Sequence, residues 1–293
     1  MTTSNSRLSQ ALASGRLALT AECLPPRDGG AAAVKKLSSL LPAHLDAVVV
    51  ADNPGGIHGS ALACASMLAG EGRPTVLSMV TRDRNRIALE SDARGAAALG
   101  VEAIFSLSGD HQSLGVCPQA AGVYDIDSIQ FTQALKGWMR EREGPLPELP
   151  IGAAAHPYQQ PIELNLLRLR KKIAAGASFV LTQAVFDLAG FTTWMDAVRA
   201  AGLDRQVAII ASVLPLTSVE QARVLDRRRT YGPVPESVIA RLSAAADPAK
   251  EGIAIAAEMA GRLKAIPGVR GIHVLSGGCE AAAGAVVRQA GLI

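Results

Sequence analysis

The feature that most restricts the fold of this chain is an alternation of short apolar segments with longer amphipathic ones, repeated eight times. The short segments, rich in β-branched and aliphatic residues, are typical of buried strands. They lie at 17–24, 46–52, 75–81, 103–109, 150–155, 178–186, 207–214 and 271–276. The stretches between them repeat apolar residues every three or four positions, as helices do. Because the strands are apolar on both faces, the alternation predicts an α/β fold: a parallel (βα)8 barrel, or TIM barrel, surrounded by helices.

We expect residues 1–293 to form a single domain of this kind, with a helix over 278–292 after the last strand. The chain is 49% hydrophobic and 19% charged, a composition that suits a large buried core and excludes disordered and fibrous proteins. A doubly wound sheet is the alternative architecture. It is disfavoured because no GxGxxG pattern follows the first strand.

Composition and the N-terminal pattern exclude several classes of function. The apolar run at 207–216 is half of the roughly 20 residues that cross a membrane, and the N-terminal stretch lacks the basic-then-apolar order of a secretion signal, so we expect a cytoplasmic protein. A net charge of +3, with few aromatic residues for base stacking, argues against a nucleic-acid partner. The four cysteines are scattered and form no CxxC motif, so we expect neither a disulfide framework nor a metal site.

Polar residues close most of the predicted strands, where an α/β barrel builds its active site. They are Glu22, Asp52, Asn53, Thr81, Arg82, Ser108, Asp110, His156, Gln183 and Ser276. Taken singly, such residues often begin turns or satisfy nearby backbone groups. Glu22 is the most unusual, because a carboxylate in the apolar run LALTAECL is costly to bury unless it is paired or used. We interpret Glu22, Asp110 and Gln183 together as a functional group, and the adjacent Cys23 as a small core residue rather than a nucleophile.

Several motifs, in one order, resemble the methylenetetrahydrofolate reductase family. The most specific are AECLPP at 21–26, LSGD at 107–110 and KK-x-x-AGA-x-F-x-x-TQ-x-x-FD at 171–187. VTRDRN, IGAAAHP, SVLPLTS and YGPVPESVIARL accompany them, so that the resemblance extends from residue 17 to about 276. It implies a TIM barrel that carries a flavin, takes hydride from NAD(P)H and reduces 5,10-methylenetetrahydrofolate to 5-methyltetrahydrofolate.

The resemblance also implies roles for the rim residues in binding a tetrahydrofolate derivative. Glu22 matches an acid that promotes opening of the methylene bridge, and a partly desolvated carboxyl is suited to protonate the departing nitrogen. Asp110 matches an acid that hydrogen-bonds the pterin and stabilises a developing cation. Gln183 matches an amide that orients folate and nicotinamide in turn. Phe186 either stacks on a substrate ring or packs in the core.

Cofactor binding is the part of the resemblance in which this chain departs from the family. Lys172 matches a residue on the phosphate side of the flavin, and Tyr124 lies near the segment that covers the flavin ring. Further positions that correspond to cofactor contacts are Ser60, Ser78, Ser108 and His156. The family usually has histidine where this chain has Ser78, arginine where it has Ser108 and tyrosine where it has His156. We therefore expect weak FAD binding, with FMN, or direct hydride transfer without a flavin, as alternatives.

Two other functions fit the same motifs. A folate-binding methyltransferase barrel would use the pterin-binding residues without redox chemistry. A subunit of a larger redox complex would receive electrons from a partner, since this chain has no cysteine cluster for an iron–sulfur centre. The sequence leaves open both a homo-oligomer and a partner redox subunit.

Overall fold

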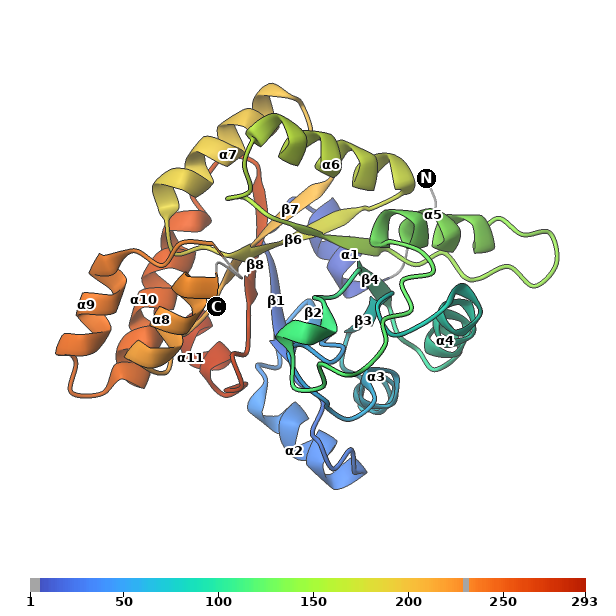
Figure 1. Ribbon diagram of the computed structural model, residues 1–293, viewed down its shortest axis with the longest axis horizontal. Helices are drawn as coiled ribbons and strands as arrows, with labels where there is room; N and C mark the ends of the chain where they lie inside the picture. The colour runs from blue at the N-terminus through green and yellow to red at the C-terminus, as the bar shows by residue number, and fades with distance from the viewer. Residues whose placement is uncertain (1–5, 229–231) are drawn as a thin grey trace.

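Eight parallel strands close into a barrel in the order β1 to β8. Figure 1 shows the helices arranged around these strands. The computed structural model describes residues 6–228 and 232–293; the first five residues, and Tyr231 at the start of the YGPVPESVIARL motif, lie outside this part. The strands are β1 Ala18–Cys23, β2 Ala47–Val50, β3 Thr75–Val80, β4 Ala103–Leu107, β5 Ile151–Ala155, β6 Phe179–Ala184, β7 Ala208–Val213 and β8 Val269–Val274. The predicted barrel is confirmed, although β8 begins two residues before its predicted segment.

The helices follow the strands as the amphipathic stretches predict. They are α2 Ala31–Leu40, α3 Ala61–Gly70, α4 Arg86–Ala98, α5 Ser128–Trp138, α6 Ile162–Ala175, α7 Leu188–Ala200, α8 Val219–Arg228, α9 Glu236–Ala244, α10 Pro248–Leu263 and α11 Ala282–Gln289. Several begin at a side chain that caps free backbone N–H groups. Asp127, for example, accepts a hydrogen bond from the Gln130 N–H at the start of α5.

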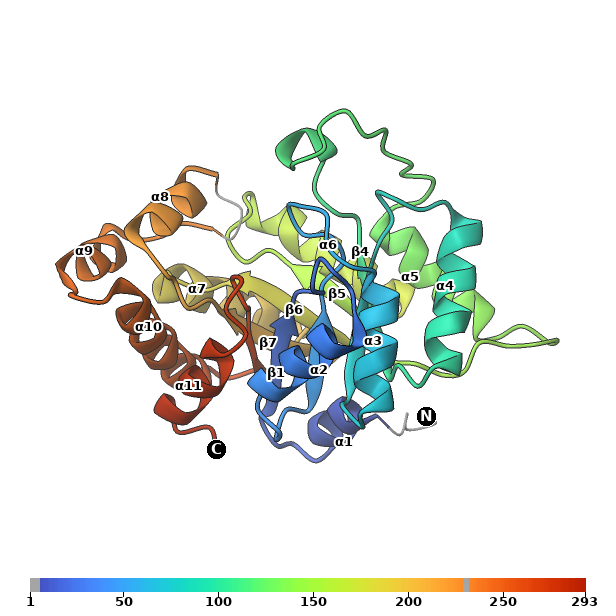
Figure 2. The ribbon, with the colours of Figure 1, turned by 90° about the horizontal axis from the view of Figure 1, so that it is seen from below.

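Two elements were not predicted from the sequence. The helix α1, Arg7–Ala13, precedes the first strand, and a short 3-10 turn, η1 Gln112–Leu114, lies between β4 and α5. Leu8 and Ala11 of α1 are buried against barrel residues such as Val49 and Phe105. Figure 2 shows α1 at one end of the molecule and the β4–α5 segment at the other. The helix therefore covers the end of the barrel opposite the loops that follow the strands.

The alternation of side chains along β1 decides which residues face the interior of the barrel. Ala18 packs with the interior cluster, whereas Leu19, Ala21 and Cys23 pack in the larger cluster that includes the surrounding helices. Since successive side chains of a strand point to opposite faces, Glu22 lies on the interior side and Cys23 on the helix side. Cys23 is 0% exposed and packs in the core, in agreement with its interpretation as a core residue.

Two further properties concern the described part of the chain. Across residues 6–228 and 232–293, no helix combines the length and the apolar character that crossing a membrane requires. The same ranges contain no group of three or more His, Cys, Asp or Glu side chains placed to hold a metal ion.

Candidate active site

Glu22, Asp110 and Gln183 lie at the carboxyl-terminal rim of the barrel. Glu22 and Gln183 are the last residues but one of β1 and β6, and Asp110 follows β4 by three residues. Because all eight strands are parallel, these positions share one rim. No hydrogen bond joins the three side chains to each other within the described residues. That they face one common cavity stays a prediction.

Glu22 is held by the segment that follows β8. Its Oε2 accepts hydrogen bonds from the backbone N–H of Ser276, at 3.2 Å, and from the Ser276 hydroxyl, at 3.3 Å. Burial raises the pKa of Glu22 above its ordinary value, and the nearby Glu280 adds to this, while the two bonds from Ser276 oppose it. The other oxygen, Oε1, has no hydrogen-bond partner among the residues described. Glu22 is therefore a fixed carboxyl that keeps its proton to a higher pH than an ordinary glutamate.

An irregularity in the sheet lies at Gln183. The register between β6 and β7 shifts between Leu181 and Ala184, and such a bulge re-aims the side chain at that point. The amide Nε2 of Gln183 lies 3.4 Å from Nδ1 of His156. Burial, helped by the charges of Lys172 and Arg168, lowers the pKa of His156 to about 4. The imidazole is therefore neutral at neutral pH, and a neutral ring can accept a hydrogen bond from the amide.

Asp110 borders a large cavity over the rim, of about 800 Å³. The cavity lies between the loops that follow β2 and β4 and the helix α8. Its lining is largely apolar and includes Pro54, Ile57, Leu114, Val116 and Leu225. The Asp110 side chain is exposed, and its carboxylate has no partner within the described ranges. A flat ring with a polar edge is the kind of ligand that an apolar cavity with one free carboxylate accommodates.

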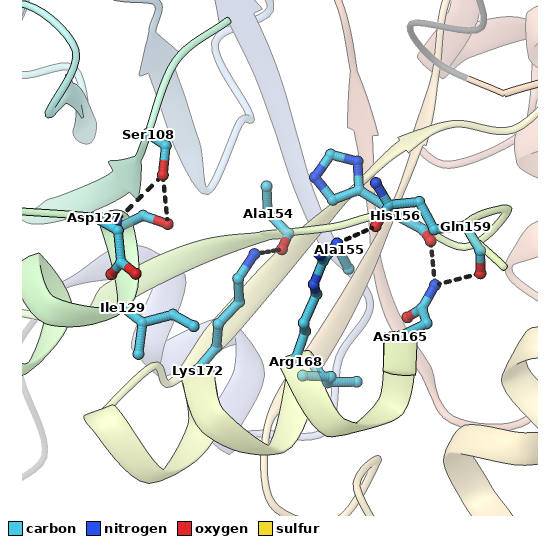
Figure 3. Close-up of a pocket in the computed structure, with 12 residues that line it drawn as sticks. Ser108, Asp127, Ile129, Ala154, Ala155, His156, Gln159, Asn165, Arg168 and Lys172 are labelled. Carbon is cyan, nitrogen blue, oxygen red and sulfur yellow. Dashed lines mark hydrogen bonds between the residues drawn. The ribbon is translucent and has the colours of Figure 1, made fainter. Parts of the chain in front are cut away.

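A second cavity, of about 320 Å³, lies between β5, α5 and α6. Figure 3 shows Lys172 and Arg168 reaching from α6 toward β5. Lys172 Nζ donates to the Ala154 carbonyl at 2.6 Å, and Arg168 donates to the side chain of Gln159 at 3.1 Å. Neither cation has a carboxylate partner in the part of the chain that the structure describes. Burial and the charge of Arg168 lower the pKa of Lys172 to about 8. Two unpaired cations at one cavity suit an anion such as a phosphate.

The predicted cofactor residues divide between this cavity and other places. Those that line it are Ser108, His156 and Lys172. Ser60 instead caps the first turn of α3 by accepting a hydrogen bond from the Ala63 N–H, and Ser78 is buried within β3, two residues before the strand ends. Tyr124 is exposed, has a φ of 42°, and donates its hydroxyl to the Asp110 carbonyl at 3.4 Å.

Asn165 and Arg168 also line the second cavity, although neither was among the site residues predicted from the sequence. Their positions, seven and four residues before Lys172, place the three on one face of a helix, and this spacing was the available signal. Asn165 donates to the backbone carbonyls of His156 and Gln159 and accepts a hydrogen bond from the Trp194 indole. It thereby fixes the loop that follows β5.

Phe186, a predicted substrate contact, is buried. It belongs to a hydrophobic cluster formed with Leu214 after β7 and with residues of the α8–α10 region. This environment favours the packing interpretation of Phe186 over stacking on a substrate ring.

Comparisons with known proteins agree with the motifs. A family model described as methylenetetrahydrofolate reductase matches residues 7–291. The 5,10-methylenetetrahydrofolate reductase of Salmonella typhimurium is 26% identical over 227 residues, which cover 74% of this chain and 71% of the relative. Methylenetetrahydrofolate reductase 2 of Saccharomyces cerevisiae is 31% identical over 129 residues, which cover 42% of this chain but only 20% of the longer yeast protein.

A solved structure supports the fold independently. It is that of an uncharacterized protein from Clostridium thermocellum, described as binding two copies of 5-methyl-5,6,7,8-tetrahydrofolic acid. Its TM-score with this chain is 0.68 at 15% sequence identity, over 98% of this chain and 100% of the other. At this identity the likeness establishes the shared fold alone.

Proposed function

The chain belongs to the methylenetetrahydrofolate reductase family, and from this premise we propose that it reduces 5,10-methylenetetrahydrofolate to 5-methyltetrahydrofolate with NAD(P)H, or catalyses the reverse oxidation. The observation that carries the proposal is Glu22, a rim carboxyl that is held by Ser276 and has a raised pKa. The reaction needs an acid at the folate, and Glu22 provides one. A cytoplasmic location, and association with further copies or with a redox partner, stay predictions.

The proposed chemistry begins with opening of the methylene bridge. The bond from the bridge carbon to one nitrogen breaks, that nitrogen takes a proton, and a 5-iminium cation remains. Glu22 supplies the proton, because burial raises its pKa and so favours the protonated carboxyl. Hydride addition to the iminium carbon then forms the methyl group.

Asp110 and Gln183 orient the substrate in this proposal. The free carboxylate of Asp110 accepts hydrogen bonds from the amino edge of the pterin and stabilises the cation as it forms. Gln183 offers a donor and an acceptor from one amide, which allows it to bind the folate or the nicotinamide. The Gln183 amide also contacts the neutral ring of His156. This contact restrains the orientation of the amide when neither ligand is bound.

The second cavity fits the phosphate of a flavin. Lys172 and Arg168 would hold it, because both are cations without a carboxylate partner in the described structure. Bound there, FAD or FMN would supply the relay that passes hydride from the nicotinamide to the folate. Ser108 donates its hydroxyl to Ser128 at 3.1 Å and has no positive charge to add, so we expect the flavin to be held loosely. Direct transfer from NAD(P)H is the alternative route.

The proposal is tested by supplying the purified protein with 5,10-methylenetetrahydrofolate and either NADH or NADPH without oxygen, with and without added FAD or FMN. We expect 5-methyltetrahydrofolate, identified by mass spectrometry, to form in step with nicotinamide oxidation. The absorption spectrum of the isolated protein reports whether flavin is bound. Binding of 5-methyltetrahydrofolate without turnover under any of these conditions would instead indicate a folate-binding or methyl-transfer barrel.

A further inference from the structure

Arg82, just after β3, connects three loops of the rim. Its Nη1 donates to the Asp110 carbonyl at 3.1 Å, and its Nη2 lies 3.5 Å from the Asn53 carbonyl. Nε and Nη2 also bind the two carboxylate oxygens of Asp83, at 2.8 and 2.7 Å. The Arg82 side chain is only 12% exposed. One guanidinium therefore joins the loops that follow β2, β3 and β4.

The backbone of Arg82 holds the β4–α5 loop on both sides of Asp110. The Arg82 N–H donates to the Ser108 carbonyl at 3.0 Å, and the Arg82 carbonyl accepts from the Val123 N–H at 2.7 Å. Gly109 has a φ of 80°, and an added Cβ would lie 3.2 Å from the Cβ of Arg82. The chain thus passes closely over Arg82 immediately before Asp110, in a conformation that favours glycine.

The backbone carbonyl of Asp110 is hydrogen-bonded, whereas its side-chain carboxylate has no partner in the described structure. The carbonyl is bound by Arg82 and by the Tyr124 hydroxyl. Asp83 engages the guanidinium in a two-pronged ion pair, and Arg82 makes no ion pair with the Asp110 carboxylate in the described structure. The carboxylate is consequently left free for a ligand while the backbone beneath it is fixed.

We propose that Arg82 is a positioning residue that aims Asp110 at the folate, a role that rests on the proposed function. The task suits arginine because a planar fork of donors reaches several acceptors at once, which a lysine ammonium on a flexible stem does not. Without the guanidinium, the backbone of Asp110 loses the hydrogen bond from Arg82, and its carboxylate can move. Misplacement of a binding group by about 1 Å costs up to roughly 100-fold in rate.

A double-mutant cycle tests this through Asp110 itself. The variants are Arg82→Gln, Asp110→Asn and the two together, assayed as kcat/KM for 5,10-methylenetetrahydrofolate. We expect Arg82→Gln to lower this value by roughly 10–100-fold, with the KM for the nicotinamide unchanged, and the double variant to match Asp110→Asn alone. Multiplied losses in the double variant would overturn the proposal, as would an Arg82→Gln enzyme with wild-type folate kinetics.

Controls separate positioning from general damage. Arg86 is 64% exposed and pairs with Asp125 in the same β4–α5 loop, so Arg86→Ala removes a loop contact without touching Asp110 and should change kcat/KM less than twofold. Should Arg82→Gln not fold, as judged by circular dichroism, Tyr124→Phe removes the other donor to the same carbonyl and should show the same coupling to Asp110→Asn, at smaller size. Wild-type turnover by Asp110→Asn would remove Asp110 from the proposed function and Arg82 with it, whereas uncoupled losses would remove Arg82 alone.

Discussion

At the scale of single residues, burial moves three side chains of the candidate site toward their neutral forms. It raises the pKa of Glu22, and it lowers that of His156 to about 4 and that of Lys172 to about 8. The three pKa shifts have the same cause, because moving a charged group from water into the protein interior costs free energy. The consequences differ: Glu22 is the proton donor of the proposed reaction, His156 is a neutral hydrogen-bond partner of Gln183, and Lys172 is the cation proposed to bind the flavin phosphate.

Lys172 gives a pH-dependent prediction for cofactor binding. Only the ammonium form attracts a phosphate, and its pKa in the free protein is about 8. Affinity for FMN or FAD should therefore fall as the pH rises above about 8, whereas riboflavin, which has no phosphate, should bind with no such change. Lys172→Met should weaken FMN binding at pH 7 by roughly 10–100-fold, the usual worth of a hydrogen bond to a charged group. Fluorescence titration measures each dissociation constant.

Two further variants make this prediction specific. Lys172→Arg keeps its charge at pH 9, so the loss of FMN affinity above pH 8 should disappear. Lys171→Met removes an exposed cation from the neighbouring position and should leave FMN affinity nearly unchanged. Equal weakening by Lys171→Met and Lys172→Met would show that only general charge attracts the phosphate.

At the scale of the elements, α10 depends on one glycine. A Cβ added to Gly252 would lie 1.7 Å from the Leu216 carbonyl oxygen, in the segment that follows β7. Gly252→Ala must therefore push the helix away from the barrel, and we expect it to lower the free energy of unfolding by about 1–3 kcal/mol. Denaturant unfolding followed by circular dichroism measures the change.

Gly261, in the same helix, is the matched control. An added Cβ there meets no atom of the described residues within 4 Å. Gly261→Ala should raise the free energy of unfolding by about 0.5–1 kcal/mol, because alanine favours a helix interior over glycine. Similar effects of the two substitutions would contradict the close approach of α10 to Leu216.

Sequence patterns predicted the elements and site residues whose signals lie in neighbouring residues of the chain. Each strand carries its own apolar signal, and the strand ends locate Glu22 and Gln183 on the rim. The helix α1 was missed because its seven residues bury only Leu8 and Ala11, too few for a recognisable period. The contact of Arg82 with Asp110 joins positions 28 residues apart, through a carbonyl that every residue has. No residue pattern indicates such a contact before the loops are placed.

At the scale of the whole molecule, the two ends of the barrel have different roles. The amino-terminal end is covered by α1 and packed with apolar residues. The other end carries Glu22, Gln183, Asp110 and both cavities described above. This separation lets the loops of the rim vary, as at Ser108 and His156, while the barrel below stays intact.

Stopped-flow measurement of the folate-dependent step in wild type and Glu22→Gln shows whether Glu22 donates a proton to the folate. The amide keeps the shape of the side chain but cannot deliver the proton, so we expect this step to slow by roughly 10²–10⁴-fold. Reduction of bound flavin by the nicotinamide, measured in the same instrument, should change little, because it needs no proton at the folate. Equal folate-dependent rates in the two proteins would contradict the account and leave Glu22 a structural acid.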